Sequence, residues 1–162
     1  MPVRHAMVGV AVVAVGLLAP AAGADPPERI PLDSLPPIVV EGACEFPIEV
    51  AEVTNKAVIK IFTSGTEITT GRLVIRVTNL STDESIVLNV SGPGFWRVSA
   101  DGSASFTLGG RSFFFGNAEM LYPLEGQATL NSGRMVLTFD ATGALVNAQF
   151  IGHTQDICAV LA

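Results

Sequence analysis

Residues 72–90 read Arg-Leu-Val-Ile-Arg-Val-Thr-Asn-Leu-Ser-Thr-Asp-Glu-Ser-Ile-Val-Leu-Asn-Val, and this stretch decides the fold class. Apolar side chains occupy every second position on both sides of a mostly polar segment, residues 79–84. The alternating apolar positions are Leu73, Ile75, Val77, Ile86, Leu88 and Val90. A period of two is typical of a strand with one buried face, so the stretch predicts a β-hairpin around a polar loop.

Short apolar runs of the same kind continue from Phe46 to Ile151, and turn residues separate them. The clearest turn signals are Gly92-Pro93-Gly94, Asp101-Gly102 and Asp140-Ala141-Thr142-Gly143. No long stretch of this region has the periodicity of a helix. The pattern predicts an all-β fold, an antiparallel β-sandwich or barrel of eight to ten short strands.

The last residues depart from this pattern and predict a short C-terminal helix. Thr154 is suited to capping a helix N-terminus, and Asp156 places an acidic residue in the first turn. Apolar residues follow at positions 157, 160 and 161. We expect this apolar face to pack on the sheet.

The first 24 residues have the parts of a secretory signal peptide. Arg4 provides a positive start, residues 7–18 are strongly apolar, and Ala22-Gly23-Ala24 forms a small-residue cleavage site. An uncleaved anchor is the alternative, but the apolar part is shorter than the roughly 20 residues of a spanning helix. We therefore expect a secreted protein, extracellular or in the cell envelope, with no membrane span after cleavage of the signal.

Two cysteines, Cys44 and Cys158, lie near the ends of the mature chain. In an oxidising compartment, one pair without Cys-x-x-Cys spacing predicts a structural disulfide. Residues 25–43 hold five of the ten prolines and predict an extended arm, in which residues 38–40 can add an edge strand. The expected plan is a signal peptide at 1–24, a proline-rich N-terminal segment at 25–43 and a disulfide-closed β domain at 44–162.

Removal of the signal leaves eight basic and fifteen acidic residues, a net charge of −7. This balance argues against nucleic acid and against an anionic membrane surface as partners, because binding to either normally needs a basic stripe. The expected partner is an unidentified extracellular or cell-envelope component.

The residues offer little for catalysis. His153 is the only histidine of the mature chain, which excludes a multi-histidine metal site. A Ser-His-Asp arrangement through His153 would lack the Gly-x-Ser-x-Gly elbow. Paired carboxylates meet only in space, so they stay open as a catalytic alternative. The sequence predicts no catalytic residue, no cofactor and no metal ligand.

Aromatic residues are the candidate ligand-binding side chains. Phe95-Trp96 follows the Gly-Pro-Gly turn, and three consecutive phenylalanines occupy positions 113–115. In a strand, these three rings cannot all lie on one face, so one is exposed if the sheet is covered on one side only. Burial in the core is the competing interpretation. The candidates are Phe95, Trp96, Phe113, Phe114, Phe115 and Tyr122.

Several short motifs occur in an order that is similar to one group of proteins. After the N-terminal signal these motifs are Cys44-x-Phe46-Pro47, Gly71-Arg72 leading into Val77-Thr78-Asn79-Leu80, Ser91-Gly92-Pro93-Gly94, Asp101-Gly102 and Asp156-Ile157-Cys158-Ala159. The chain resembles small secreted proteins of uncharacterised function from high-GC Gram-positive bacteria. The resemblance covers most of the mature chain and implies an exported β domain with a terminal disulfide. It implies no activity, cofactor or site residue.

Three functional expectations follow from these observations. The first is a secreted binding module, or an envelope-associated structural module, of unknown ligand. The second is an apolar-ligand carrier, if the sheet closes as a barrel with an open interior. The third is a secreted hydrolase that uses dispersed carboxylates or His153.

Overall fold

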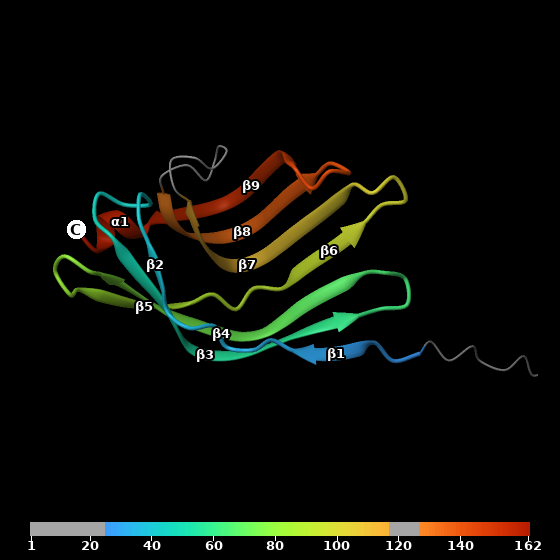
Figure 1. Ribbon diagram of the computed structural model, residues 1–162, viewed down its shortest axis with the longest axis horizontal. Helices are drawn as coiled ribbons and strands as arrows, with labels where there is room; N and C mark the ends of the chain where they lie inside the picture. Colours follow the sequence, from blue (N-terminus) through green and yellow to red (C-terminus); the bar gives the residue numbers. More distant parts are fainter. Residues whose placement is uncertain (1–24, 117–126) are drawn as a thin grey trace, which may run out of the picture.

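Within residues 25–116 and 127–162, which the computed structural model describes, nine antiparallel strands form one open sheet that is followed by a short helix (Figure 1). The elements are β1 (Glu28–Pro31), β2 (Ile38–Val40), β3 (Ile48–Ile61), β4 (Glu67–Asn79), β5 (Ser85–Asn89), β6 (Gly94–Val98), β7 (Ala104–Gly116), β8 (Gln127–Phe139), β9 (Leu145–Asp156) and α1 (Ile157–Val160). The predicted all-β class and the C-terminal helix are confirmed. The predicted signal peptide and Tyr122 lie outside the described residues.

The sheet runs in the order β1–β3–β4–β6–β7–β8–β9, with β2 also paired to β3 and β5 also paired to β4. β4 and β5 form the hairpin that the sequence predicts, with Thr78 opposite Ser85. The sheet curves until β3 and β4 face β7 and β8 across a hydrophobic core (Figure 1). The described residues therefore form neither a closed barrel nor two separate sheets. Five of the strands have 12 to 14 residues and are longer than expected.

A row of three glycines crosses the sheet from β7 to β9. Gly110, Gly133 and Gly152 are cross-strand partners, with φ angles of 75°, 154° and 153°. A Cβ atom on Gly133 would lie 2.2 Å from the carbonyl oxygen of Ile151, and one on Gly152 would lie 2.2 Å from that of Ser132. Glycine is required at Gly133 and Gly152 because any side chain would collide with the neighbouring backbone, whereas Gly110 is favoured by its positive φ alone.

The glycine row coincides with a change in which positions of β8 are buried. Before it, the buried apolar residues are Ala128 and Leu130, at even positions. After it, they are Met135 and Leu137, at odd positions. Ala128 and Leu130 belong to the hydrophobic core, whereas Met135 and Leu137 are the cross-strand partners of Leu108 and Phe106, which face the concave side. Because successive side chains of a strand point to opposite faces, the inner face of β8 therefore shifts by one residue between Leu130 and Met135.

The hydrophobic core lies between the facing parts of the sheet and extends to α1. Ile48 on β3, Val77 on β4 and Ile157 on α1 are fully buried in it. The predicted disulfide is present: Cys44 and Cys158 are bonded, with their Cα atoms 5.4 Å apart. It joins the segment before β3 to α1 and closes almost the whole domain.

The helix is shorter than the sequence predicts, and its N-cap is Asp156 instead of Thr154. The Asp156 carboxylate accepts a hydrogen bond from the Ala159 amide at 3.1 Å. Thr154 belongs to β9, where its hydroxyl donates to Asn131 Oδ1 at 2.8 Å. Pairing between β9 and β8 continues through Asp156, which leaves four residues for α1.

Candidate functional site

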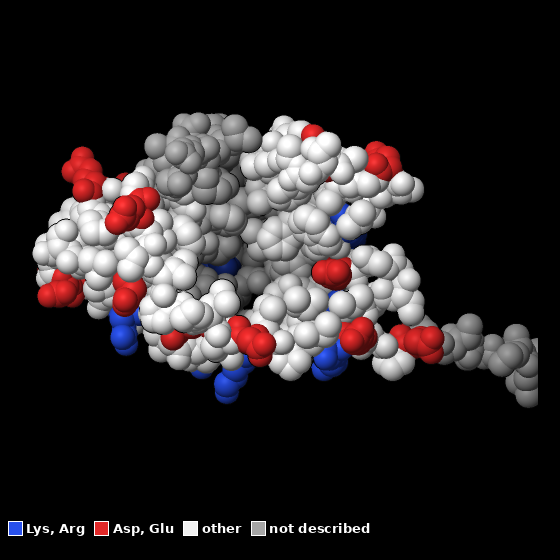
Figure 2. Space-filling model, viewed as in Figure 1, with Lys and Arg blue, Asp and Glu red and all other residues white. Residues whose placement is uncertain are grey.

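The concave side of the sheet contains an apolar cavity of about 560 Å³. On one side, Thr69, Leu73 and Ile75 of β4 line it. From β7 the lining residues are Phe106, Leu108, Ser112, Phe113, Phe114 and Phe115. Figure 2 shows the molecule hollowed on this side. The volume lies within the roughly 300 to 1,000 Å³ that is usual for small-molecule sites.

The proline-rich segment contributes the third side of the cavity. Leu32, Leu35, Pro36 and Ile38 line it. The Leu32 amide donates to the carbonyl oxygen of Ala57 at 3.0 Å, which attaches the segment to β3. Ile38 begins β2, so the expected edge strand at residues 38–40 is confirmed. We call residues 32–38 the arm.

Glu52 is the only charged residue among the described residues that line the cavity. Its carboxylate accepts hydrogen bonds from the Leu35 amide at 3.3 Å and from Asn55 Nδ2 at 3.2 Å. A bulge between Glu52 and Thr54 interrupts the pairing of β3 with β4 at this point. The arm is thus held to β3 beside a negative charge, while the rest of the cavity wall is mostly hydrocarbon.

The aromatic candidates from the sequence fall into separate environments. Phe113, Phe114 and Phe115 all contribute atoms to the cavity wall; Phe113 and Phe115 share one face of β7 and pack against the core, with rings 5.8 Å apart, and the ring of Phe114 alternates with them. Trp96 packs between Phe106 and Phe139, with ring centroids 5.9 and 5.5 Å away. The Trp96 indole is therefore part of an aromatic cluster beside the cavity, while Phe106 belongs to both.

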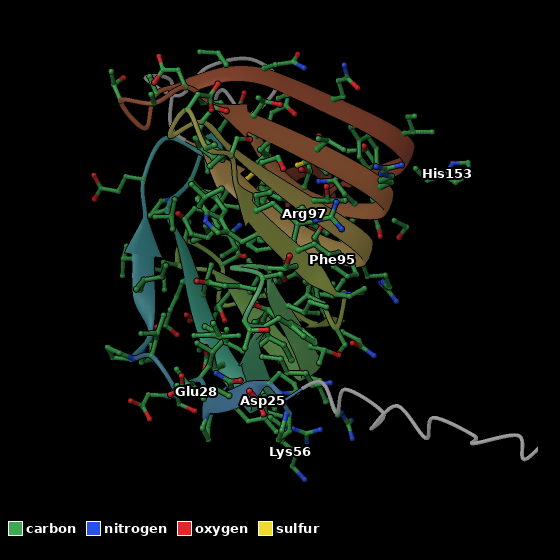
Figure 3. All side chains as sticks on the ribbon, turned by 90° about the vertical axis from the view of Figure 1, so that its right-hand side faces the viewer. Asp25, Glu28, Lys56, Phe95, Arg97 and His153 are labelled. Carbon is green, nitrogen blue, oxygen red and sulfur yellow. A yellow bond between two sulfur atoms is a disulfide. The ribbon has the colours of Figure 1, made fainter. Side chains whose placement is uncertain are left out.

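Phe95 lies on the opposite face of β6 from Trp96, away from the cavity. It lines a second, open depression of about 410 Å³ on the outer face of β6, β7 and β8. The other residues of this depression are Arg97, Ser105, Thr107, Gly109 and Arg134. Figure 3 labels Phe95 and Arg97, which both extend from β6. The structure thus separates Phe95 from the other described aromatic candidates.

His153 is exposed on β9, directly opposite Ser132 on β8. Figure 3 shows its ring pointing away from the concave side of the sheet. Among the described hydrogen bonds, none joins it to a carboxylate. Within the described ranges, no three His, Cys, Asp or Glu residues are grouped so that they could hold a metal ion.

Two aspartates have altered acidity, but both act within their own turns. The Ser103 hydroxyl and amide donate to Asp101 and lower the pKa of its carboxyl. The Thr142 hydroxyl, the Ala144 amide and the Thr142 amide lower the pKa of Asp140 in the same way. These contacts stabilise the turns before β7 and β9, which is a structural role.

Sequence reasoning missed most of the cavity. Leu73, Ile75 and Leu108 are apolar residues of alternating strands, and nothing local distinguishes a cavity wall from a filled core. Gly92 and Gly94 also line the cavity. A Cβ on Gly92 would lie 2.1 Å from the carbonyl oxygen of Gly109, so the Gly-Pro-Gly turn allows the chain to pass close to β7.

The chain matches no protein-family model, and neither a curated protein nor a solved structure is significantly similar to it. No helix in the part of the chain that the structure describes is long and apolar enough to cross a membrane.

Proposed function

We propose that the protein binds an apolar small molecule, such as the acyl chain of a neutral lipid, in the cavity between β4, β7 and the arm. The observation that supports this proposal is a cavity of about 560 Å³ whose lining side chains are predominantly leucine, isoleucine, valine and phenylalanine. A hydrocarbon chain that leaves water for such a site gains roughly 0.8 kcal/mol for each buried methylene. The protein would then be a carrier, which is one of the three functions that the sequence allows.

The position of Glu52 favours a ligand without a negative charge. Its carboxylate lies beside Leu35 of the arm and lines the cavity. A fatty acid anion placed there would meet a like charge in a partly desolvated site, whereas an ester or alcohol head group would not. Neutral acyl lipids, such as a monoacylglycerol, are therefore the preferred ligand class.

The export that the sequence predicts would agree with the same proposal. The Cys44–Cys158 disulfide is compatible with an oxidising compartment, where apolar molecules need a carrier to pass through water. The hydrolase alternative has no comparable support, because His153 is exposed on the outside of β9 and has no carboxylate partner among the described hydrogen bonds.

Neighbouring threonines on β4 provide a matched test. Thr69 lines the cavity, and Thr70 points to the opposite face of the same strand. Thr69→Phe should fill part of the cavity and weaken binding of the neutral fluorescent probe N-phenyl-1-naphthylamine at least about tenfold, a loss of roughly 1.4 kcal/mol. Thr70→Phe adds the same ring outside the cavity and should leave the affinity unchanged.

Competition against the probe tests the ligand class. A monoacylglycerol should displace it at lower concentration than a fatty acid of equal chain length at pH 7, and Glu52→Gln should reduce that difference. Absence of probe binding by the wild-type protein, or equal affinity of the two phenylalanine variants, would rule out the cavity as a ligand site.

A further inference from the structure

Five cations line up on the outer face of the sheet, on the side of β3 and β4 that faces away from the cavity. They are Arg29 on β1, Lys56 and Lys60 on β3, and Arg72 and Arg76 on β4, and we call them the basic stripe. Arg72 and Arg76 alternate with Leu73 and Ile75, which line the cavity, so the cations point outward. All of them except the half-buried Lys60 are exposed.

The strand register brings these cations together in like-charged pairs. Arg29 lies directly opposite Lys60, and Lys56 lies directly opposite Arg72. Like charges at directly opposed positions destabilise a sheet. Two such pairs, four residues apart along β3, thus work against folding, and a binding role would explain their presence.

Acidic residues of β3 and β4 mostly lie away from the stripe, and the exposed Asp25 and Glu28 adjoin it only at its Arg29 end. Glu52 lines the cavity, and Glu67, which lies opposite Trp96, shares its inner face. Glu49 remains on the outer side, near the start of β3. Figure 2 shows Lys and Arg side chains projecting below β3 and β4, and Figure 3 shows Lys56 pointing away from the sheet.

The stripe is long enough to contact an extended surface. It runs four residues along β4, from Arg76 to Arg72, and four more along β3, from Lys56 to Lys60. At about 3.3 Å per residue this is roughly 27 Å. Several anionic groups could therefore contact it at the same time.

Apolar side chains beside the stripe distinguish between a membrane and a soluble polyanion. Val87 lies opposite Arg76 and is 55% exposed, and Val53, in the bulge of β3, is 48% exposed. A bilayer surface offers anionic head groups for the cations and an apolar interior for the valines, whereas a soluble polyanion contacts only the cations. We propose that the outer face of β1, β3 and β4 docks on the surface of an anionic membrane.

The net charge of −7 led to the expectation that the protein does not bind an anionic membrane surface, whereas the basic stripe favours such binding. The arrangement of the charges on the molecule explains this difference. Many acidic residues lie in turns and loops, such as Asp83, Glu84, Asp101 and Asp140. At physiological ionic strength, charges act over about 8 Å. A surface that touches the stripe therefore responds mainly to its cations and little to the sum over the whole molecule.

Docking through the stripe goes beyond ligand binding in the cavity and does not depend on it. The two sites use opposite faces of β3 and β4, so a change in one leaves the side chains of the other in place. Failure of vesicle binding would not affect the carrier proposal, and failure of probe binding would not affect the docking proposal.

Vesicle sedimentation tests the proposal with variants of equal charge. Wild-type protein should bind phosphatidylglycerol vesicles, bind phosphatidylcholine vesicles far less, and lose binding as salt is raised. Lys56→Gln combined with Arg72→Gln should weaken binding about 25-fold, at roughly fivefold for each lost cation. The control combines Arg97→Gln with Arg134→Gln, which removes two cations from the outer depression, and should retain most of the binding.

Three results would overturn the proposal. They are equal binding of both vesicle types, equal loss in the two double variants, and binding of soluble heparin in preference to phosphatidylglycerol vesicles. The last result would assign the stripe to a soluble polyanion. Because the stripe variant removes a repulsion, its melting temperature should be at least that of the wild type, which separates lost docking from misfolding.

Discussion

Lys56 and Arg72 lie directly opposite each other on β3 and β4, and both are exposed on the outer face of the sheet. Their like charges oppose the pairing of these two strands. Lys56→Glu should therefore stabilise the protein by about 0.5 to 1 kcal/mol, because it converts the repulsion into an attractive cross-strand pair. Urea unfolding at low salt measures the change.

The same substitution should weaken binding to anionic vesicles, so stability and docking should change in opposite directions. High salt should reduce the gain in stability, since it screens the charges. A Lys56→Glu protein that is less stable than the wild type would show that the register does not bring these side chains into electrostatic contact.

Gly133 is the central member of the glycine row, and its substitution should be strongly destabilising. A Cβ atom there would lie 2.2 Å from the carbonyl oxygen of Ile151, and the residue has a positive φ. Gly133→Ala should cost at least about 3 kcal/mol, because backbone strain adds to a collision that no side-chain rotation relieves. Thermal unfolding followed by circular dichroism measures the loss.

Gly143 is the matched control, because it also has a positive φ but has no atom within 4 Å of a Cβ. Gly143→Ala should cost about 1 to 2 kcal/mol, the strain of the backbone alone. Equal costs at the two positions would mean that the close approach of β8 and β9 does not hold in solution.

Removal of the disulfide should lower stability substantially. Cys44 and Cys158 are separated by 114 positions, so the bond restricts almost the whole unfolded chain. Replacing both with alanine should cost about 2 to 5 kcal/mol. Denaturant unfolding of the variant and of the reduced wild-type protein should give similar midpoints, and an unchanged midpoint in both would contradict a stabilising role.

Asp140 should make the free energy of unfolding depend on pH in the acid range. Hydrogen bonds from the Thr142 hydroxyl, then from the Ala144 and Thr142 amides, hold its pKa below the ordinary value of 3.8 in the folded protein. A carboxyl with a lowered folded pKa contributes stability above its unfolded pKa and loses it as the pH falls through the folded pKa. Stability should therefore decline below about pH 4.

Asp140→Asn removes the titrating group and should flatten part of that decline. Asp101, whose pKa is lowered by the Ser103 hydroxyl and then by its amide, accounts for a further part. Melting temperatures between pH 2 and pH 6 provide the comparison. An identical pH profile for Asp140→Asn and the wild type would exclude this carboxylate as a contributor.

Local patterns predicted the strands well because alternation is a property of neighbouring residues. Leu73, Ile75 and Val77 identified β4 and its hairpin in this way. The glycine row could not be predicted, because Gly133 meets Gly110 and Gly152 only through the strand register, which depends on long-range pairing.

The candidate site was predicted in part for the same reason. The run Phe113 to Phe115 is unusual, so the sequence predicted it as a candidate, and it lines the cavity. Leu35 of the arm and Leu108 of β7 also line the cavity but were not predicted, since their chemistry matches that of any core residue. A ligand site lined by hydrocarbon differs from a core only by the space between its walls, which no single segment of the sequence encodes.

Asn79 should be the most sensitive buried polar position in the described structure. It is 1% exposed, its Nδ2 donates to the carbonyl oxygen of Leu161 at 2.8 Å, and its Oδ1 accepts from the Ser81 amide at 2.8 Å. Asn79→Ala would leave both backbone groups without these partners and should cost about 2 to 4 kcal/mol. It should also loosen the C-terminal tail from β4.

Asn89 provides the control, since it forms the same local contact without burial. Its Oδ1 accepts from the Ser91 amide at 3.0 Å, and the residue is exposed. Asn89→Ala should cost less than about 1 kcal/mol, because water can satisfy the Ser91 amide. Hydrogen exchange should show faster exchange in α1 for Asn79→Ala only. Unchanged exchange there would mean that the disulfide alone holds the tail in place.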